Sequence, residues 1–259
     1  MPIKISASTI CWMHGDRREA LKKAALAGFQ YVEMIIMAPE VANFHNHSLR
    51  TVSVKTLADD YREFGLKCSG LHIGGLPTDA RLSGALDYAR TAIEAAPQLG
   101  ADIIVMGGPD RKSEPFRPFI EAVETLIPHL EKNSVRLAIE NHHHNWVQYI
   151  QDYDFIFDFI KSPMIGMTLD TGHFAAAGVD PEEAARKFAS QVMNVHVKDQ
   201  IGVHSVEMGM GVTNNRGCVI ALREAGYDGY LTQEIEISRD LADAAAANGY
   251  KYMQVLARQ

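Results

Sequence analysis

The sequence is poor in cysteine and has no long apolar run. Its three cysteines, Cys11, Cys68 and Cys218, are odd in number and far apart in a chain of 259 residues. They form no closely spaced pair of the kind that binds zinc, and their scarcity favours a reducing compartment. No apolar stretch approaches the ~20 residues of a membrane helix, and residues 1–4 do not resemble a secretion leader. We therefore expect a cytoplasmic protein with no membrane partner.

A concentrated basic surface is also missing from the sequence. The chain has 25 basic and 32 acidic side chains and a formal net charge of -7. Nucleic-acid-binding proteins usually present a basic face. The densest basic stretch, residues 17–23, is simply explained as the solvated face of a helix. We therefore expect no nucleic-acid partner.

Eight β-rich runs alternate with amphipathic helical stretches along the whole sequence. The predicted strands are Ile3–Thr9, Tyr31–Met37, Lys67–Ile73, Asp102–Met106, Arg136–Asn141, Ile165–Asp170, Val192–Lys198 and Tyr230–Ile237. The predicted helices include Ser83–Leu99, Phe119–Lys132, Pro181–Ala189, Asn215–Ala225 and Leu241–Leu256. Regular strand–helix alternation requires parallel strands with helices packed outside them. Eight such units predict a single (β/α)8 barrel domain over residues 1–259, because such barrels contain about 250 residues.

Glycines mark the predicted joints between helices and strands. Gly28, Gly65, Gly100 and Gly226 each stand where a helix should end, and glycine accepts the left-handed conformation of a helix C-terminus. The alternative architecture is a doubly wound open sheet. It is weakened because residues 8–12 carry no glycine-rich phosphate turn after the first strand.

Polar residues end the fifth and sixth predicted strands. In a barrel, the active site is built from the C-terminal strand ends. Glu140 follows the apolar Leu137–Ile139, where an ionised carboxylate needs an ion-pair partner or a metal. Asp170 ends the sixth strand and could cap a helix. However, His173 follows it in a segment that we predict to be a loop over the mouth, which favours a functional site.

The seventh and eighth strands carry similar residues. Alternation along the seventh strand places His196 and Lys198 on one face. A lone histidine would be typical of a barrel core, but the shared lysine favours the barrel mouth. Glu234 and Glu236 share a face of the eighth strand, where two carboxylates repel each other unless a cation lies nearby or they point outward to helix-borne cations. Of the two, we favour Glu234 for the site.

Glu140, Asp170, His196 and Glu234 together offer three carboxylates and one imidazole. An oxygen-rich set of this kind favours one divalent ion, Mn²⁺, Mg²⁺ or Co²⁺, over Zn²⁺, since no thiolate joins it.

Further polar and aromatic residues lie at or just beyond strand ends. They are Trp12, His72 and His142, with Lys198 and His173 nearby. Such groups suit the hydroxyls and the apolar face of a sugar, so we predict that they bind the substrate. For His142 the alternative is a surface loop formed by the three consecutive histidines of residues 142–144.

At these positions the chain resembles the xylose-isomerase-like barrel superfamily. That group contains sugar isomerases and epimerases, hydroxypyruvate isomerase, inosose dehydratase and endonuclease IV. The matching segments are Ile-Glu-Asn-His at 139–142, Leu-Asp-Thr-Gly-His at 169–173, Val-His-Val-Lys-Asp at 195–199 and residues 226–234, together with residues 28–33. The resemblance spans nearly the whole chain.

The resemblance implies that the four-residue set binds one divalent metal ion. In ketose 3-epimerases the glutamates that correspond to Glu140 and Glu234 also shuttle the substrate proton, and His173 matches a residue that binds substrate oxygens. Two segments depart from the epimerase pattern: residues 200–204 lack its arginine, and Gly209-Met210-Gly211 replaces its Gly-Glu-Gly. Lys198-Asp199 is frequent in members that resemble inosose dehydratase.

The predicted activity is therefore removal of a proton next to the carbonyl of a keto-sugar or keto-polyol. Return of the proton gives epimerisation or isomerisation, whereas loss of a β-hydroxyl gives dehydration. Endonuclease-type DNA repair would need more zinc ligands and a basic groove. A non-catalytic sugar-binding subunit is disfavoured by the complete ligand set. The sequence leaves the sugar and the oligomeric state open, a homo-oligomer included.

Overall fold

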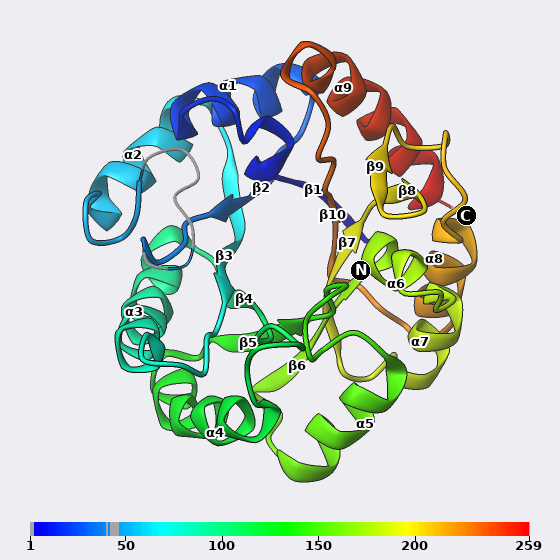
Figure 1. The fold of residues 1–259 in the computed structure, drawn as a ribbon. Helices are drawn as coiled ribbons and strands as arrows, with labels where there is room; N and C mark the ends of the chain where they lie inside the picture. The colour runs from blue at the N-terminus through cyan, green and yellow to red at the C-terminus, as the bar shows by residue number, and fades with distance from the viewer. Residues whose placement is uncertain (1–2, 40, 42–46, 259) are drawn as a thin grey trace.

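Eight parallel strands close into a barrel in the computed structural model, which describes residues 3–39, 41 and 47–258 (Figure 1). Around the barrel the strand order is β1-β10-β7-β6-β5-β4-β3-β2. The barrel strands are β1 (Lys4–Ser8), β2 (Tyr31–Ile35), β3 (Lys67–Gly75), β4 (Ile103–Gly107), β5 (Arg136–Glu140), β6 (Ile165–Asp170), β7 (Val192–Val197) and β10 (Tyr230–Gln233). The (β/α)8 fold predicted from the strand–helix alternation is confirmed.

Helices surround the barrel and cover its outer face (Figure 1). They are α1 (Arg17–Ala27), α2 (Val54–Glu63), α3 (Leu82–Ala95), α4 (Phe116–Asn133), α5 (Ile150–Phe159), α6 (Thr171–Ala176), α7 (Pro181–Phe188), α8 (Asn215–Glu224) and α9 (Arg239–Leu256), with 3-10 turns η1 (Thr9–Trp12) and η3 (Ala96–Leu99). All four predicted glycine joints have positive φ, as expected. No helix in the described part of the chain has the length and apolar character to cross a membrane.

The last barrel strand is shorter than predicted. It ends at Gln233 instead of Ile237. The Glu234 amide still donates to the Val197 carbonyl at 3.0 Å, but the next amide, of Ile235, faces the Cys11 sulfur at 3.4 Å. The chain therefore leaves the barrel wall just where the predicted site residues begin.

Two elements at the barrel mouth were not predicted. Residues after Asp170 form helix α6 instead of a loop, and the Asp170 Oδ1 atom caps this helix by accepting from the His173 amide at 2.7 Å. Six residues are too few to show helical periodicity. Strands β8 (Asp199–Ile201) and β9 (His204–Val206) form an antiparallel hairpin beside the barrel.

A polar layer lies inside the barrel, below its mouth. The hydroxyls of Ser6 and Ser69 lie 2.7 Å apart. The Thr232 hydroxyl donates to Asn194 Oδ1 at 3.2 Å, and Asn194 Nδ2 donates to Glu33 Oε2 at 2.9 Å. Most of the apolar core packs instead between the strands and the helices. The interior therefore offers hydrogen bonds to groups at the mouth.

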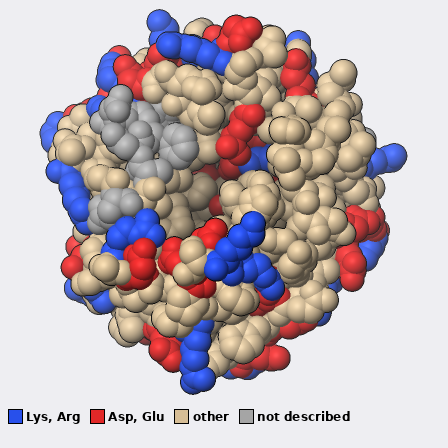
Figure 2. Space-filling view, in the orientation of Figure 1, with Lys and Arg blue, Asp and Glu red and all other residues tan. Residues whose placement is uncertain are grey.

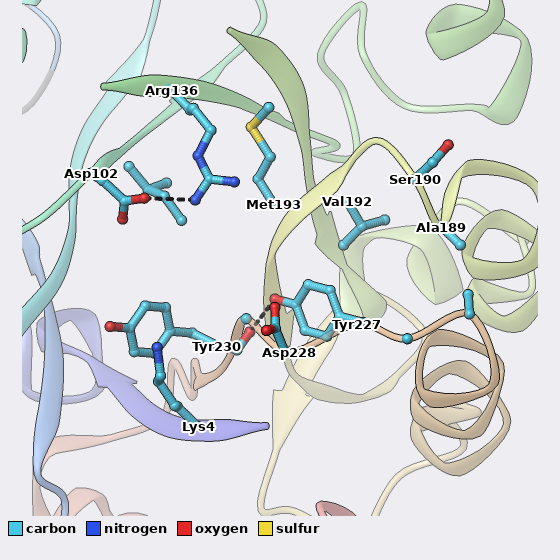
Figure 3. Close-up of a pocket in the computed structure, with 14 residues that line it drawn as sticks. Lys4, Asp102, Arg136, Ala189, Ser190, Val192, Met193, Tyr227, Asp228 and Tyr230 are labelled. Carbon is cyan, nitrogen blue, oxygen red and sulfur yellow. Dashed lines mark hydrogen bonds and ion pairs between the residues drawn. The ribbon is translucent and has the colours of Figure 1, made fainter. Parts of the chain in front are cut away.

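The opposite end of the barrel has a cavity of about 360 Å³ (Figure 3). Arg136 pairs with Asp102 at 2.8 Å across it, and the Lys4 ammonium lies 5.0 Å from the ring centre of Tyr230. None of the predicted site residues lines this cavity. In barrels of this type, residues at the N-terminal face serve stability, and chemistry takes place at the other end.

Candidate metal and active site

The four predicted metal ligands lie together at the C-terminal mouth of the barrel. One ligand atom from each of Glu140, Asp170, His196 and Glu234 lies within 4.8 Å of the others. His196 Nδ1 lies 2.5 Å from Glu140 Oε1, 2.9 Å from Glu234 Oε2 and 3.9 Å from Asp170 Oδ2. All four residues are buried. Together the four side chains form a group that could hold a metal ion.

Parallel pairing and one amide side chain align the strand ends. Asp170 pairs with His196 across β6 and β7, and Thr232 pairs with His196 across β10 and β7. The Asn141 side chain donates to the Asp170 carbonyl and accepts from the Asp170 amide, each at 2.8 Å. The ends of β5 and β6 are thereby fixed relative to each other.

Glu140, Glu234 and His196 form a tightly coupled charged group. Burial alone would raise the pKa of the Glu140 carboxyl, but His72 and His196 outweigh it and hold the pKa well below its usual range. Lys198 and His196 likewise hold the pKa of Glu234 well below its usual range against burial. Burial would lower the pKa of His196, but Glu33, Glu234 and Glu140 raise it well above normal. Both glutamates are therefore ionised at neutral pH.

Asp170 differs from the two glutamates. Burial, with the charges of Glu234 and Glu140, raises the pKa of its carboxyl to about 7. Its Oδ1 atom caps α6, whereas its Oδ2 atom accepts no hydrogen bond. Glu234 Oε2 is also buried, and its near neighbour is His196 Nδ1 at 2.9 Å. A buried carboxylate oxygen without a donor, as at Asp170 Oδ2, is costly unless a cation compensates it, so these residues fit a divalent metal ion.

Lys198 directly follows β7, enters the same site and is fully buried. Its Nζ atom lies 3.0 Å from Glu234 Oε1, 2.7 Å from Glu236 Oε1 and 3.6 Å from Asp170 Oδ2. The side chain shares the inward face with His196, as the alternation predicts. Glu236, which we expected to be less important than Glu234, also lies at the mouth, where its carboxylate accepts a hydrogen bond from the Lys198 ammonium.

Gly172 makes room for the lysine. A Cβ atom at position 172 would lie 2.7 Å from the Cβ and Cγ atoms of Lys198. The Thr171 hydroxyl accepts from the Lys198 amide at 3.0 Å. The Thr171-Gly172 pair after Asp170 therefore packs directly against the strand that carries Lys198.

Asp199 points away from the site and holds the loop that departs from the epimerase pattern. Its Oδ2 atom accepts from the amides of Gly209 and Gly211, each at 2.9 Å. A Cβ atom at position 211 would lie 2.2 Å from Asp199 Oδ1, so this turn requires glycine there. Asp199 thus has a structural role, whereas Lys198 belongs to the site.

A cavity of about 220 Å³ opens above the four-residue set. Glu140, Glu234, His72, His142 and His173 are among its lining residues. His72 Nε2 lies 3.3 Å from Glu140 Oε2. Figure 2 shows acidic side chains bordering a hollow at the centre of this face. Three of the predicted substrate-binding histidines therefore face the space in which a small substrate would lie.

Trp12 does not join them. Its indole is buried in the short turn η1, and Nε1 donates to Asp243 Oδ1 of α9 at 2.9 Å. It is absent from the described residues that line the mouth cavities. We predicted substrate contact for Trp12 because it lies just beyond a strand end. The chain, however, turns tightly after β1 and directs the Trp12 ring toward helix α9.

Glu33 is a site residue that the motif analysis did not select. Its Oε1 atom lies 2.9 Å from His196 Nε2, whereas His196 Nδ1 faces Glu140 and Glu234. A glutamate inside the apolar segment Tyr31–Ile36 was a visible signal. The rule that a buried carboxylate needs a partner, which singled out Glu140, applies equally to it.

The fold and the strand-end cluster define a (β/α)8 barrel with a candidate metal site at its C-terminal mouth. A family model described as xylose isomerase-like TIM barrel matches residues 21–256, and the chain belongs to this family. The resemblance found in the sequence motifs is therefore confirmed.

Individual relatives are distant in sequence. An inosose dehydratase of Geobacillus kaustophilus is 22% identical, over 98% of this chain and 92% of its own. The solved structure of an L-ribulose 3-epimerase superposes with a TM-score of 0.81 at 18% identity, covering 99% of this chain and 95% of the other. An IolI protein with a bound zinc atom superposes with a TM-score of 0.80 at 18% identity, covering 98% of each chain. These structures share the fold.

Proposed function

We propose that this protein is a divalent-metal-dependent enzyme that removes a proton next to the carbonyl of a keto-sugar or keto-polyol and returns it as an isomerase or epimerase. The observation that carries the proposal is the placement of Glu140 and Glu234. They lie at the ends of β5 and β10, which β6 and β7 separate in the barrel, and both contact His196 and line the same cavity.

Glu140, Asp170, His196 and Glu234 would hold the metal ion. Manganese, magnesium or cobalt suits the three carboxylates. Because the IolI structure contains a zinc atom, zinc should be tested as well. When bound, such an ion acts as a Lewis acid that lowers the pKa of the C–H bond beside a carbonyl.

The protein's own groups would carry the proton. Glu140 and Glu234 are ionised carboxylates, and either can accept a proton from one face of the substrate carbon as a general base. His173 and His72 line the cavity beside them and can bind substrate oxygens. Lys198 supplies a fixed positive charge beside the site, which favours negative charge developing on the substrate.

Dehydration is the second candidate. It is supported by the inosose dehydratase similarity, which spans nearly the whole of both chains, and by Lys198-Asp199 in place of the epimerase pattern. Elimination begins with the same proton abstraction but also needs an acid for the leaving hydroxyl. In this proposal Lys198 is the acid, and His173, whose Nε2 lies 3.3 Å from Lys198 Nζ, passes the proton to the leaving group.

The deciding experiment is incubation with ketoses, keto-inositols and 3-keto-glycosides in D₂O with Mn²⁺, followed by NMR. We expect deuterium to appear on the carbon next to a carbonyl in at least one substrate. Formation of the epimer or isomer supports the first candidate, and formation of an unsaturated product supports the second. Absence of exchange with the whole panel, by protein shown to contain metal, would contradict both.

A further inference from the structure

Three histidines form a second cluster beside the carboxylate site. His142 and His143 lie in the segment after β5, and His173 lies in α6 after β6. The ring centres of His142 and His173 are 3.8 Å apart, and the Nδ1 atoms of His143 and His173 are 2.7 Å apart. One ring nitrogen from each histidine lies within 4.8 Å of the others. No carboxylate belongs to this trio.

We propose that His142, His143 and His173 form a second metal site, which binds a borderline transition-metal ion such as Zn²⁺ and is distinct in chemistry from the carboxylate-rich site. Three imidazoles with an open fourth position are a common arrangement for protein-bound zinc. Imidazole ligands favour zinc, nickel or copper, whereas carboxylate sets favour magnesium or manganese.

The hydrogen bonds of the trio leave the required nitrogens available. His142 Nδ1 donates to the His143 carbonyl at 2.6 Å, which leaves Nε2 as the free lone pair. A metal-binding histidine commonly donates its other ring nitrogen in this way. The Nδ1 atoms of His143 and His173 form one hydrogen bond with each other. A metal ion bound between them would replace this hydrogen bond, and the two nitrogens would need to move apart by about half an ångström.

Lys198 lies beside the trio, and the carboxylates of Glu234 and Glu236 offset its positive charge. Its longest hydrogen bond, at 3.3 Å, goes to His173 Nε2, while Glu234 and Glu236 lie closer to its ammonium. If His173 binds metal through Nδ1, its Nε2 atom carries the ring proton and no longer accepts from Lys198, which keeps its two glutamate partners.

The trio is accessible from solvent. A cavity of about 400 Å³ is lined by His142, His143 and His173 together with Gln200, His204 and Glu236. An ion can enter there without passing the carboxylate set, and water or a substrate oxygen can fill its open position. Because His142 and His173 are also candidate substrate contacts, zinc and sugar would compete for them.

Metal counting at equilibrium tests the proposal separately from activity. Metal-free protein is dialysed against excess Zn²⁺, and bound zinc is measured by inductively coupled plasma mass spectrometry. We expect two ions per chain in the unmodified protein, one in His143→Ala and one in Asp170→Asn, and none in the double variant. His144→Asn is the matched control and should keep both ions, because residue 144 belongs to the same histidine run but not to the trio.

Circular dichroism melting checks that each variant folds. One zinc per chain in the unmodified protein, unchanged by His143→Ala, would overturn the proposal. Two zinc ions unchanged by His143→Ala and by the alternative His142→Gln would also overturn it. Loss of an ion in Asp170→Asn reports on the carboxylate site alone, so failure of either site is recognised independently.

Discussion

The Nε2 atom of His196 lies 2.9 Å from Glu33 Oε1, although 163 residues separate the two in the chain. Glu33 is held in turn by Asn194, which accepts from Thr232. A hydrogen-bonded chain thus runs from the barrel interior to His196 Nε2, while His196 Nδ1 faces the carboxylates of Glu140 and Glu234. Carboxylates in this position orient a histidine and raise its affinity for metal.

Glu33→Gln should therefore weaken metal binding without removing a predicted ligand. We expect the dissociation constant for Mn²⁺ to rise about 10–100-fold, measured by calorimetric titration. Turnover should recover at saturating metal, because the amide still fills the same space. Glu94→Gln, an exposed glutamate on α3, is the matched control. An unchanged metal affinity in Glu33→Gln would show that Glu33 fills space in the barrel but does not support metal binding by His196.

Glu140→Gln and Glu234→Gln should each lower kcat by about 10²–10⁴-fold, because a general base is lost. Circular dichroism should show an intact barrel in both. Deuterium exchange into the substrate is the sharper measurement, since it reports the proton abstraction alone. If either variant exchanges at the normal rate with metal bound, the two-glutamate assignment is wrong.

Lys198→Met should destabilise the metal-free protein by about 3–5 kcal/mol, because it leaves buried carboxylates without their cation. Added Mn²⁺ should recover part of this loss, since a bound divalent ion compensates Glu234 and Asp170. Urea unfolding with and without metal measures both values. Lys161→Met, which removes an exposed lysine paired with Asp158, should change stability by less than about 1 kcal/mol. Equal effects of the two substitutions would contradict the buried-charge argument.

Asp170 should make metal binding depend on pH. Its pKa is raised by burial from 3.8 to about 7, so the folded metal-free protein holds a proton there that the ionised ligand must release. Affinity for Mn²⁺ should increase as the pH rises toward 7. The number of protons released per ion should fall by about one between pH 6 and pH 8.5, as calorimetry in buffers of different ionisation enthalpy can measure.

The same shift has a defined effect on the stability of the metal-free protein. A carboxyl with a raised folded-state pKa contributes stability that is fully present below pH 3.8 and is lost as the pH rises through about 7. Asp170→Asn should flatten this part of the pH dependence of the unfolding free energy. A proton release that does not vary with pH would show that Asp170 is already ionised in the folded protein.

Much of the fold and of the central site could be read from the sequence. Strand–helix alternation indicated parallel strands with outer helices, and the count of eight units favoured the closed barrel over an open sheet. Glu140 and Asp170 stood out because a carboxylate at the end of an apolar strand needs a partner. Once the barrel closes, all C-terminal strand ends meet at one mouth, so residues distant in the chain become neighbours.

Only the tertiary structure decided which groups complete the site. The ring of Trp12 is turned toward Asp243 by a short 3-10 turn, and His173 is placed by a helix of six residues. Neither element is long enough to leave a periodic pattern. The contacts of Glu33 with His196 and of His143 with His173 depend on barrel closure and side-chain direction. The spacing of residues in the sequence predicts the helices and strands. Contacts such as Glu33 with His196 arise only when elements far apart in the chain pack together.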